Sequence, residues 1–128
     1  MKITLEQAAQ MVADAQTVIL TSHIRPDGDS IGSTLGLMHY LREQGKDARV
    51  LIDDEIPRIF HILPGIEQIE RPAEGTRYTA DLLIVCDVEL KRTGAVLDAV
   101  DAVRVLNIDH HVTNDEAAED LYLNPDYA

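Results

Sequence analysis

Four short apolar runs, separated by segments of helical pattern, constrain the fold of this chain more than any other feature. The runs cover residues 17–21, 48–52, 82–86 and 103–108. The third run is apolar throughout, as expected of a strand that is covered on both faces. Between the first two runs, apolar residues repeat at helical spacing over residues 31–41. This alternation predicts an α/β fold with a parallel sheet.

Short crossover connections predict a Rossmann-like sheet with flanking helices, in the strand order 2-1-3-4. A further helix is expected at residues 4–16, where Thr4 and Gln7 form a capping-box pattern. Gly32 and Gly36 predict tight packing of the second helix on the sheet. Weaker patterns predict a helical segment at 57–63, a short strand at 67–69, a surface connection at 71–79 and a helical turn at 95–100.

Composition narrows the class of protein. The chain has 128 residues, which fit one domain, and a formal net charge of −12. This charge leaves no basic face for long nucleic acid, but it does not exclude small phosphorylated ligands. No apolar run approaches the length of a membrane span, and the single cysteine, Cys86, allows no disulfide within the chain. We therefore expect a cytoplasmic protein without a membrane partner, in which Cys86 belongs to the core.

The residues best suited to chemistry follow three of the four apolar runs. They are His23, Asp27 and Asp29 in the segment 22–30, Asp87, and the triplet Asp109-His110-His111. The carboxyl ends of parallel strands share one edge of the sheet, and α/β proteins bind their ligands there. By itself, the segment 22–30 is equally compatible with Asp29 as a helix cap and His23 as an ordinary loop residue.

This set combines histidine and carboxylate ligands without thiolates, which suits manganese or a similar divalent ion better than structural zinc. One carboxylate can bridge two ions, and two ions roughly 3.5–4 Å apart can clamp a phosphoryl group during in-line displacement. A neighbouring histidine can contact the phosphate or protonate the leaving oxygen. The acidic residues 53–55 offer a second place for a metal, although their pattern favours a solvated loop. The sequence therefore indicates metal-dependent chemistry at phosphorus.

The motif His23-x-x-Pro26-Asp27-Gly28-Asp29-Ser30, with Asp87 and Asp109-His110-His111, resembles the first three motifs of the DHH (RecJ-like) phosphoesterase superfamily. Flanking segments are similar to its branch of oligoribonucleases and phosphoadenosine-phosphate phosphatases: Leu35-Gly36-Leu37, Gly45-Lys46, Ile56-Pro57-x-x-Phe60, Leu63-Pro64-Gly65, Arg92-Thr93-Gly94 and Thr113-Asn114. Members of that branch hydrolyse very short RNA oligomers, 3′-phosphoadenosine 5′-phosphate or linear dinucleotides, typically with manganese. The resemblance extends over nearly the whole chain.

The resemblance implies five metal ligands: His23, Asp27, Asp29, Asp87 and His110. His23 and Asp27 would hold one manganese ion, and Asp29 and His110 would hold the other. Asp87 would bridge the two ions. Magnesium or cobalt are the other ions that such ligands accept.

The remaining residues of the third motif, Asp109 and His111, are implied to be catalytic. His111 would face the scissile phosphate, and Asp109 would orient the site through hydrogen bonds to the ligands. The candidate substrate contacts are His111, Arg25 and Arg92. For Arg25, solvent and a substrate phosphate are both open; for Arg92, a structural role and a place near the substrate are both open. Asn114 is expected to cap the loop after the triplet.

The superfamily also predicts how much of the protein this chain represents. Members continue through a fourth motif and a carboxyl-terminal substrate-binding domain, so residues 1–128 are expected to be the amino-terminal part of a DHH phosphoesterase domain. Such a part should have little or no activity alone. The expected partners are small nucleotides or very short RNA, with a homodimer as an open possibility. The alternative functions are an inorganic pyrophosphatase or exopolyphosphatase of the same superfamily and a non-catalytic nucleotide-binding module.

Overall fold

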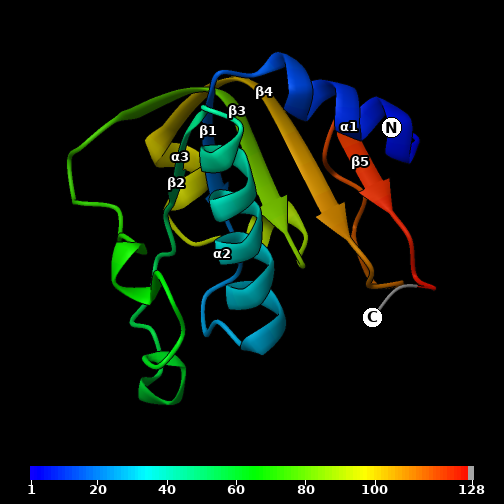
Figure 1. The fold of residues 1–128 in the computed structure, drawn as a ribbon. Coiled ribbons are helices and arrows are strands. Elements are labelled where there is room, and N and C mark those ends of the chain that lie inside the picture. Colours follow the sequence, from blue (N-terminus) through cyan, green and yellow to red (C-terminus); the bar gives the residue numbers. More distant parts are fainter. Residues whose placement is uncertain (127–128) are drawn as a thin grey trace.

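The predicted parallel sheet is present and has one strand more than the sequence patterns indicate. The computed structural model describes residues 1–126, in which five parallel strands lie in the order β2-β1-β3-β4-β5 (Figure 1). The bounds are Thr17–Thr21 for β1, Asp47–Val50 for β2, Tyr78–Cys86 for β3, Val100–Asp109 for β4 and Asp120–Leu123 for β5. The order predicted for the first four strands is confirmed.

Within the described part of the chain, three α-helices accompany the sheet: α1 at Leu5–Asp14, α2 at Gly28–Glu43 and α3 at Val96–Ala99. Single 3₁₀ turns occupy Arg58–Phe60 (η1), Ile66–Gln68 (η2) and Leu90–Arg92 (η3). The capping box of α1 is confirmed, because the Gln7 backbone N–H donates to Thr4 Oγ1 at 3.1 Å and the Thr4 N–H donates to Gln7 Oε1 at 2.9 Å. None of the helices described in residues 1–126 is long and apolar enough to cross a membrane.

The helix α2 begins earlier than residue 31, where the apolar repeat starts. Asp27 is its N-cap residue, and its Oδ1 accepts a hydrogen bond from the Ser30 backbone N–H at 2.9 Å. The Ser30 hydroxyl in turn accepts one from the Asp27 N–H, also at 2.9 Å. The cap of this helix is therefore Asp27 and not Asp29, since a carboxylate at the N-cap satisfies amides that the first turn leaves open.

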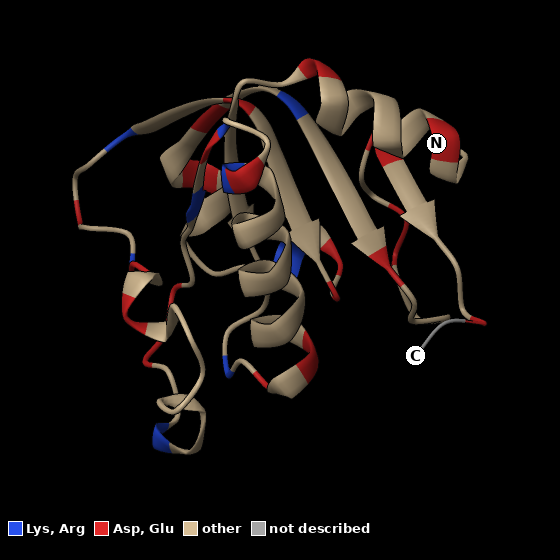
Figure 2. Ribbon diagram, viewed as in Figure 1, with Lys and Arg blue, Asp and Glu red and all other residues tan. Residues whose placement is uncertain are grey.

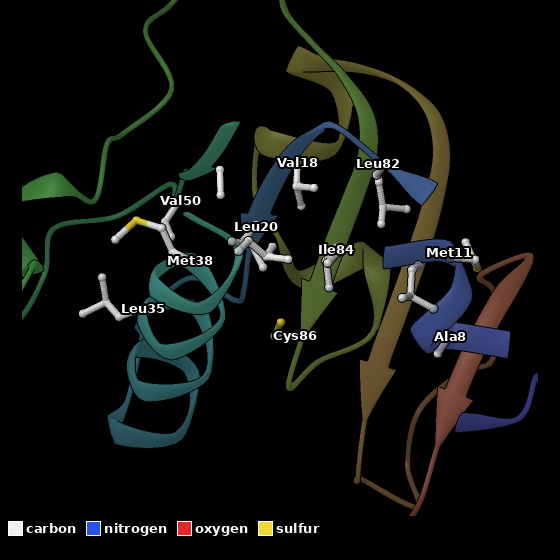
Figure 3. Close-up of a cluster of buried hydrophobic side chains, with 14 of the residues drawn as sticks. Ala8, Met11, Val18, Leu20, Leu35, Met38, Val50, Leu82, Ile84 and Cys86 are labelled. Carbon is white, nitrogen blue, oxygen red and sulfur yellow. The ribbon is translucent and has the colours of Figure 1, made fainter. Parts of the chain in front are cut away.

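Both faces of the sheet are buried along β1 and the second half of β3. On one face, residues of α1 and α2 such as Met11, Leu35 and Met38 form a cluster with Leu20 and Ile84 (Figure 3). The alternate residues Ile19, Leu83 and Val85 belong to a second cluster that includes Val96 of α3. Burial on both faces explains why the run 82–86 carries no polar residue. Cys86 is buried in the first cluster, as predicted.

Three local predictions are wrong. The segment 67–69 is not a strand: η2 covers most of it, and the backbone pairs only at a single bridge between Leu51 and Glu70. Gly32 and Gly36 are exposed, and a Cβ added at either would meet nothing within 4 Å, so they do not serve close packing on the sheet. The surface connection at 71–79 ends early, because β3 begins at Tyr78 and pairs there with Val100.

Candidate metal centre

The predicted ligands come together because β1, β3 and β4 are adjacent and parallel. His23 follows β1 by two residues, Asp87 follows β3 directly, and Asp109 is the last residue of β4. Asp27 and Asp29 lie at the start of α2, at the same edge of the sheet. Figure 2 shows the acidic residues gathered at the ends of β3 and β4 and at the beginning of α2.

Asp87 is the central residue of this cluster. Its Oδ1 lies 2.5 Å from His110 Nε2, and its Oδ2 lies 3.9 Å from His23 Nε2. His23 Nε2 is also 3.7 Å from Asp27 Oδ2. The two oxygens of one carboxylate thus face histidines from two different strand ends, which is the arrangement that a bridging ligand requires.

The backbone and the burial of Asp87 hold it in an unusual state. Its φ angle is +67°, in the left-handed region that non-glycine residues seldom adopt, and its N–H donates to the Ile108 carbonyl oxygen at 2.8 Å. Its side chain is 6% exposed. Burial raises the pKa of Asp87 above the usual value, although the hydrogen bond to His110 acts in the opposite direction. A cation that neutralises a buried carboxylate of this kind offsets the free-energy cost of burying its charge.

The ring of His23 directs its two nitrogens to different partners. Its Nδ1 lies 2.7 Å from the Ile24 carbonyl oxygen, which can only accept, so Nδ1 carries the proton. The lone pair of Nε2 then points toward the carboxylates of Asp27 and Asp87. In Asp27, burial acts to raise the pKa, but hydrogen bonds from Ser30 and the nearby His23 outweigh it, so the pKa lies below the usual value.

Asp109 organises the third motif through hydrogen bonds. Its Oδ1 accepts from the His110 backbone N–H at 2.8 Å and lies 2.6 Å from His111 Nδ1. Its Oδ2 accepts from Asn114 Nδ2 at 2.8 Å. Asn114 Oδ1 also accepts from the Glu116 N–H at 2.7 Å, which agrees with the predicted role of Asn114 in capping this loop.

The donors fit a hard or borderline divalent ion. Among residues 1–126, two groups of potential ligands are found, and within each group the ligand atoms lie within 4.8 Å of one another. His23, Asp27 and Asp87 form one group, and Asp87, Asp109, His110 and His111 form the other. Asp87 belongs to both. No thiolate competes, because burial, with a smaller effect of Asp87, raises the pKa of Cys86 to about 12. Imidazole and carboxylate together suit manganese and related ions.

Asp29, Arg92 and Arg25, the other predicted site residues, differ in their position relative to the centre. Asp29 is exposed and belongs to neither ligand group, but it lines a hollow of about 440 Å³ with Asp87 and His110. Arg92 lines a separate hollow of about 200 Å³ with residues of the centre, including His23 and His111. Arg25 is absent from the lining of both hollows, and its backbone N–H donates to Asp54 Oδ2 at 2.8 Å.

One residue that shapes the centre was not recognised in the sequence. Asn107, within β4, is buried, and its Nδ2 donates to the carbonyl oxygens of Val85 at 3.0 Å and Val88 at 2.7 Å. These two bonds bracket Asp87 and fix the turn in which it lies. In the sequence, Asn107 is a lone amide side chain in an otherwise apolar part of the run 103–108. Such a residue indicates a structural role, because a buried polar group has to find hydrogen-bond partners.

A comparison with protein families finds that residues 17–128 match the DHH family, N-terminal domain. The chain belongs to the DHH family. Its match includes the ends of β1, β3 and β4 and therefore all the residues of the centre described above.

Curated relatives share the name bifunctional oligoribonuclease and PAP phosphatase NrnA. The protein of Thermus thermophilus is 38% identical over 97 residues, which cover 76% of this chain and 28% of the relative. The protein of Bacillus subtilis is 26% identical over 108 residues, covering 84% and 33%. The chain thus spans about a third of the length of the curated relatives it matches.

A solved structure has the same fold. It is an exopolyphosphatase-related protein from Bacteroides fragilis, with a TM-score of 0.79 and 27% sequence identity. The superposition covers 94% of this chain and 38% of that chain. The α/β fold with a parallel sheet is therefore one that another protein of related sequence adopts.

Proposed function

We propose that the protein is a manganese-dependent phosphoesterase that hydrolyses short oligoribonucleotides, linear dinucleotides or 3′-phosphoadenosine 5′-phosphate. The observation that carries this proposal is the position of Asp87, whose carboxylate belongs to two groups of potential metal ligands at once. The names of the curated relatives, oligoribonuclease and PAP phosphatase, supply two of these substrate classes. The single cysteine suits a reducing compartment, so we place the activity in the cytoplasm.

In this proposal, His23 and Asp27 would hold one ion, His110 and Asp29 would hold the second, and Asp87 would be a ligand shared by both. Bound divalent ions supply a nucleophile that is active near neutral pH and neutralise charge on the transferring phosphoryl group. Asp29 lies outside both ligand groups and borders the same hollow as Asp87 and His110.

The remaining roles fall to residues beside the ligands. His111 is half-exposed and lies next to the centre, where its ring can contact the phosphate or give a proton to the leaving oxygen. Asp109 holds that ring through His111 Nδ1 at 2.6 Å. Arg92 offers a guanidinium group, which pairs well with phosphate oxygens, at the rim of the same hollow.

Charge favours small substrates. The chain carries 23 acidic residues against 11 basic ones, so a long polyanion would be repelled over most of the surface. A mononucleotide or a dinucleotide places only a few phosphates near the protein, and these can lie at the metal centre beside Arg92.

The test is a comparison of substrates on the intact protein. Purified protein is assayed in manganese, and after treatment with EDTA, against a two-nucleotide RNA, 3′-phosphoadenosine 5′-phosphate and inorganic pyrophosphate. We expect metal-dependent release of mononucleotide from the RNA and of phosphate from 3′-phosphoadenosine 5′-phosphate, with Asp87→Asn as the inactive control. Equal rates with and without metal would reject the metal-dependent mechanism.

A second candidate function is hydrolysis of pyrophosphate or polyphosphate, because the structural neighbour is named an exopolyphosphatase-related protein. The same ligands would serve both reactions, so only substrate preference separates them. Turnover of pyrophosphate or polyphosphate alone would favour this second function. Binding of nucleotides in manganese without any turnover would favour a non-catalytic module instead.

A further inference from the structure

The acidic segment 53–55, which follows β2, has a role that neither a metal site nor a solvated loop describes. It contributes to none of the potential metal groups found among residues 1–126. Two of its carboxylates instead accept backbone hydrogen bonds from loops at the metal centre. Asp54 accepts from the Arg25 N–H, and Asp53 accepts from the Ala95 N–H, each at 2.8 Å.

Asp53 is in close contact with the loop that follows η3. Its Oδ2 accepts the Ala95 N–H, and its Oδ1 lies 3.3 Å from Arg71 Nε, which holds the carboxylate from the other side. Gly94 has a φ angle of +64°, and a Cβ added there would lie 2.5 Å from Asp53 Oδ2. Only glycine permits this approach of the loop to the carboxylate.

The loop that Asp53 holds carries Arg92. The Arg92 carbonyl oxygen accepts the Ile24 N–H at 3.2 Å, so the loop is also tied to the residue after His23. Arg92 also lines the hollow that His23 and His111 line. Its side chain makes no hydrogen bond or ion pair within residues 1–126, which leaves it available to an anion in that hollow.

We propose that Asp53 is a positioning residue, which orients Arg92 toward the phosphate of the substrate by holding the loop through the Ala95 amide. The proposal rests on the proposed phosphoesterase function. Asp53 lies outside the hollow and touches neither metal ligand nor substrate, so it acts only through the loop. Its loss should weaken binding of a phosphate without changing the affinity for manganese.

The test uses the intact protein with Asp53→Ala, Arg92→Ala and the double variant. We expect Asp53→Ala to raise KM for 3′-phosphoadenosine 5′-phosphate about tenfold with kcat changed less than about threefold. Adding Asp53→Ala to Arg92→Ala should change KM less than about twofold, because the two residues act as one unit. Asp53→Asn retains an acceptor oxygen and should restore most of the affinity. Independent effects that multiply in the double variant would overturn the proposal.

Two further measurements separate this inference from the proposed function. Amide hydrogen exchange at Ala95 should be faster in Asp53→Ala, and orthophosphate should bind the manganese-loaded variant more weakly than the wild type. Glu55→Gln is the matched control, since it removes an acidic charge two residues away whose side chain has no hydrogen bond or ion pair within residues 1–126. Unchanged exchange at Ala95, or unchanged orthophosphate affinity, would overturn the role of Asp53. Absence of turnover in the wild type would instead refute the phosphoesterase function.

Discussion

His110 Nε2 lies 2.5 Å from one oxygen of Asp87, while His23 Nε2 faces the other oxygen of the same carboxylate at 3.9 Å. The two histidines come from the ends of β4 and β1, on either side of β3. One residue therefore connects the two halves of the proposed site, and its substitution is the most direct test of the proposed chemistry.

Replacing Asp87 with asparagine should abolish activity while preserving the fold. Asparagine has nearly the same shape and tolerates the positive φ of this position, but it cannot supply a negative oxygen to either ion. We expect kcat to fall by at least about a thousandfold, and manganese affinity at both sites to fall, as measured by calorimetric titration. Turnover close to that of the wild type would show that Asp87 does not bridge two ions.

The same substitution should have a pH-dependent effect on the stability of the metal-free protein. Burial raises the pKa of Asp87 in the folded state above the ordinary value of an aspartic acid, which is the value expected in the unfolded state. Below that ordinary value, the Asp87 carboxyl is neutral in both the folded and the unfolded state and does not change the free energy of unfolding. Above the folded-state pKa, the buried charge lowers the free energy of unfolding. In EDTA, Asp87→Asn should therefore be more stable than the wild type near pH 8 and gain little near pH 4. Urea unfolding of both proteins at each pH measures this difference, and an equal difference at both pH values would contradict it.

Asp27 is both the N-cap of α2 and a proposed ligand, and two substitutions separate these roles. Serine at position 27 keeps a cap oxygen for the Ser30 N–H but removes the carboxylate. Asp27→Ser should weaken manganese binding and leave the free energy of unfolding nearly unchanged. Asp27→Ala should weaken binding equally and also cost about 1 kcal/mol of stability. Identical stabilities for the two variants would argue against the cap.

Asn114 should support catalysis without touching substrate. It is buried, and its Nδ2 donates to Asp109 Oδ2 at 2.8 Å and to Asn107 Oδ1 at 3.1 Å. Asn114→Ala leaves two buried acceptors without this donor, which should cost about 1–3 kcal/mol in urea unfolding. Because Asp109 then holds His111 less firmly, kcat should fall about tenfold or more while KM changes little. A raised KM with an unchanged kcat would instead place Asn114 near the bound substrate.

Asp29 should matter for only one of the two ions. It borders the hollow with His110 but lies apart from the group formed by His23, Asp27 and Asp87. Asp29→Asn should lower the affinity for the manganese ion assigned to His110 about tenfold and leave the affinity for the ion assigned to His23 and Asp27 unchanged. Calorimetric titration with manganese resolves the two events. Weakening of both ions to the same degree would place Asp29 in a different role.

Local sequence determined the main strands and the identity of the proposed ligands. Residues 18–20 of β1 and 82–86 of β3 are recognisable because burial on both faces excludes polar side chains. In β4, by contrast, Val103 and Arg104 are exposed. The ends of these strands carry the motif residues, and adjacency of parallel strands brings His23, Asp87 and Asp109 to one edge. The strands and the motif residues at their ends are recognisable in short stretches of sequence. The adjacency of the strands follows from the general preference for short, right-handed connections between parallel strands.

Only the tertiary structure decided what the less regular segments do. β5 has just four residues, and it forms because β4 offers an open edge, which no local pattern reveals. Asp53 and Asp29 look alike in the sequence as carboxylates beside element ends, yet one holds the Ala95 amide and the other faces the hollow beside His110. A side chain's direction and its partners depend on how distant loops meet. Contacts such as that between Asp53 and Ala95, 42 residues apart, exist only once the sheet has assembled.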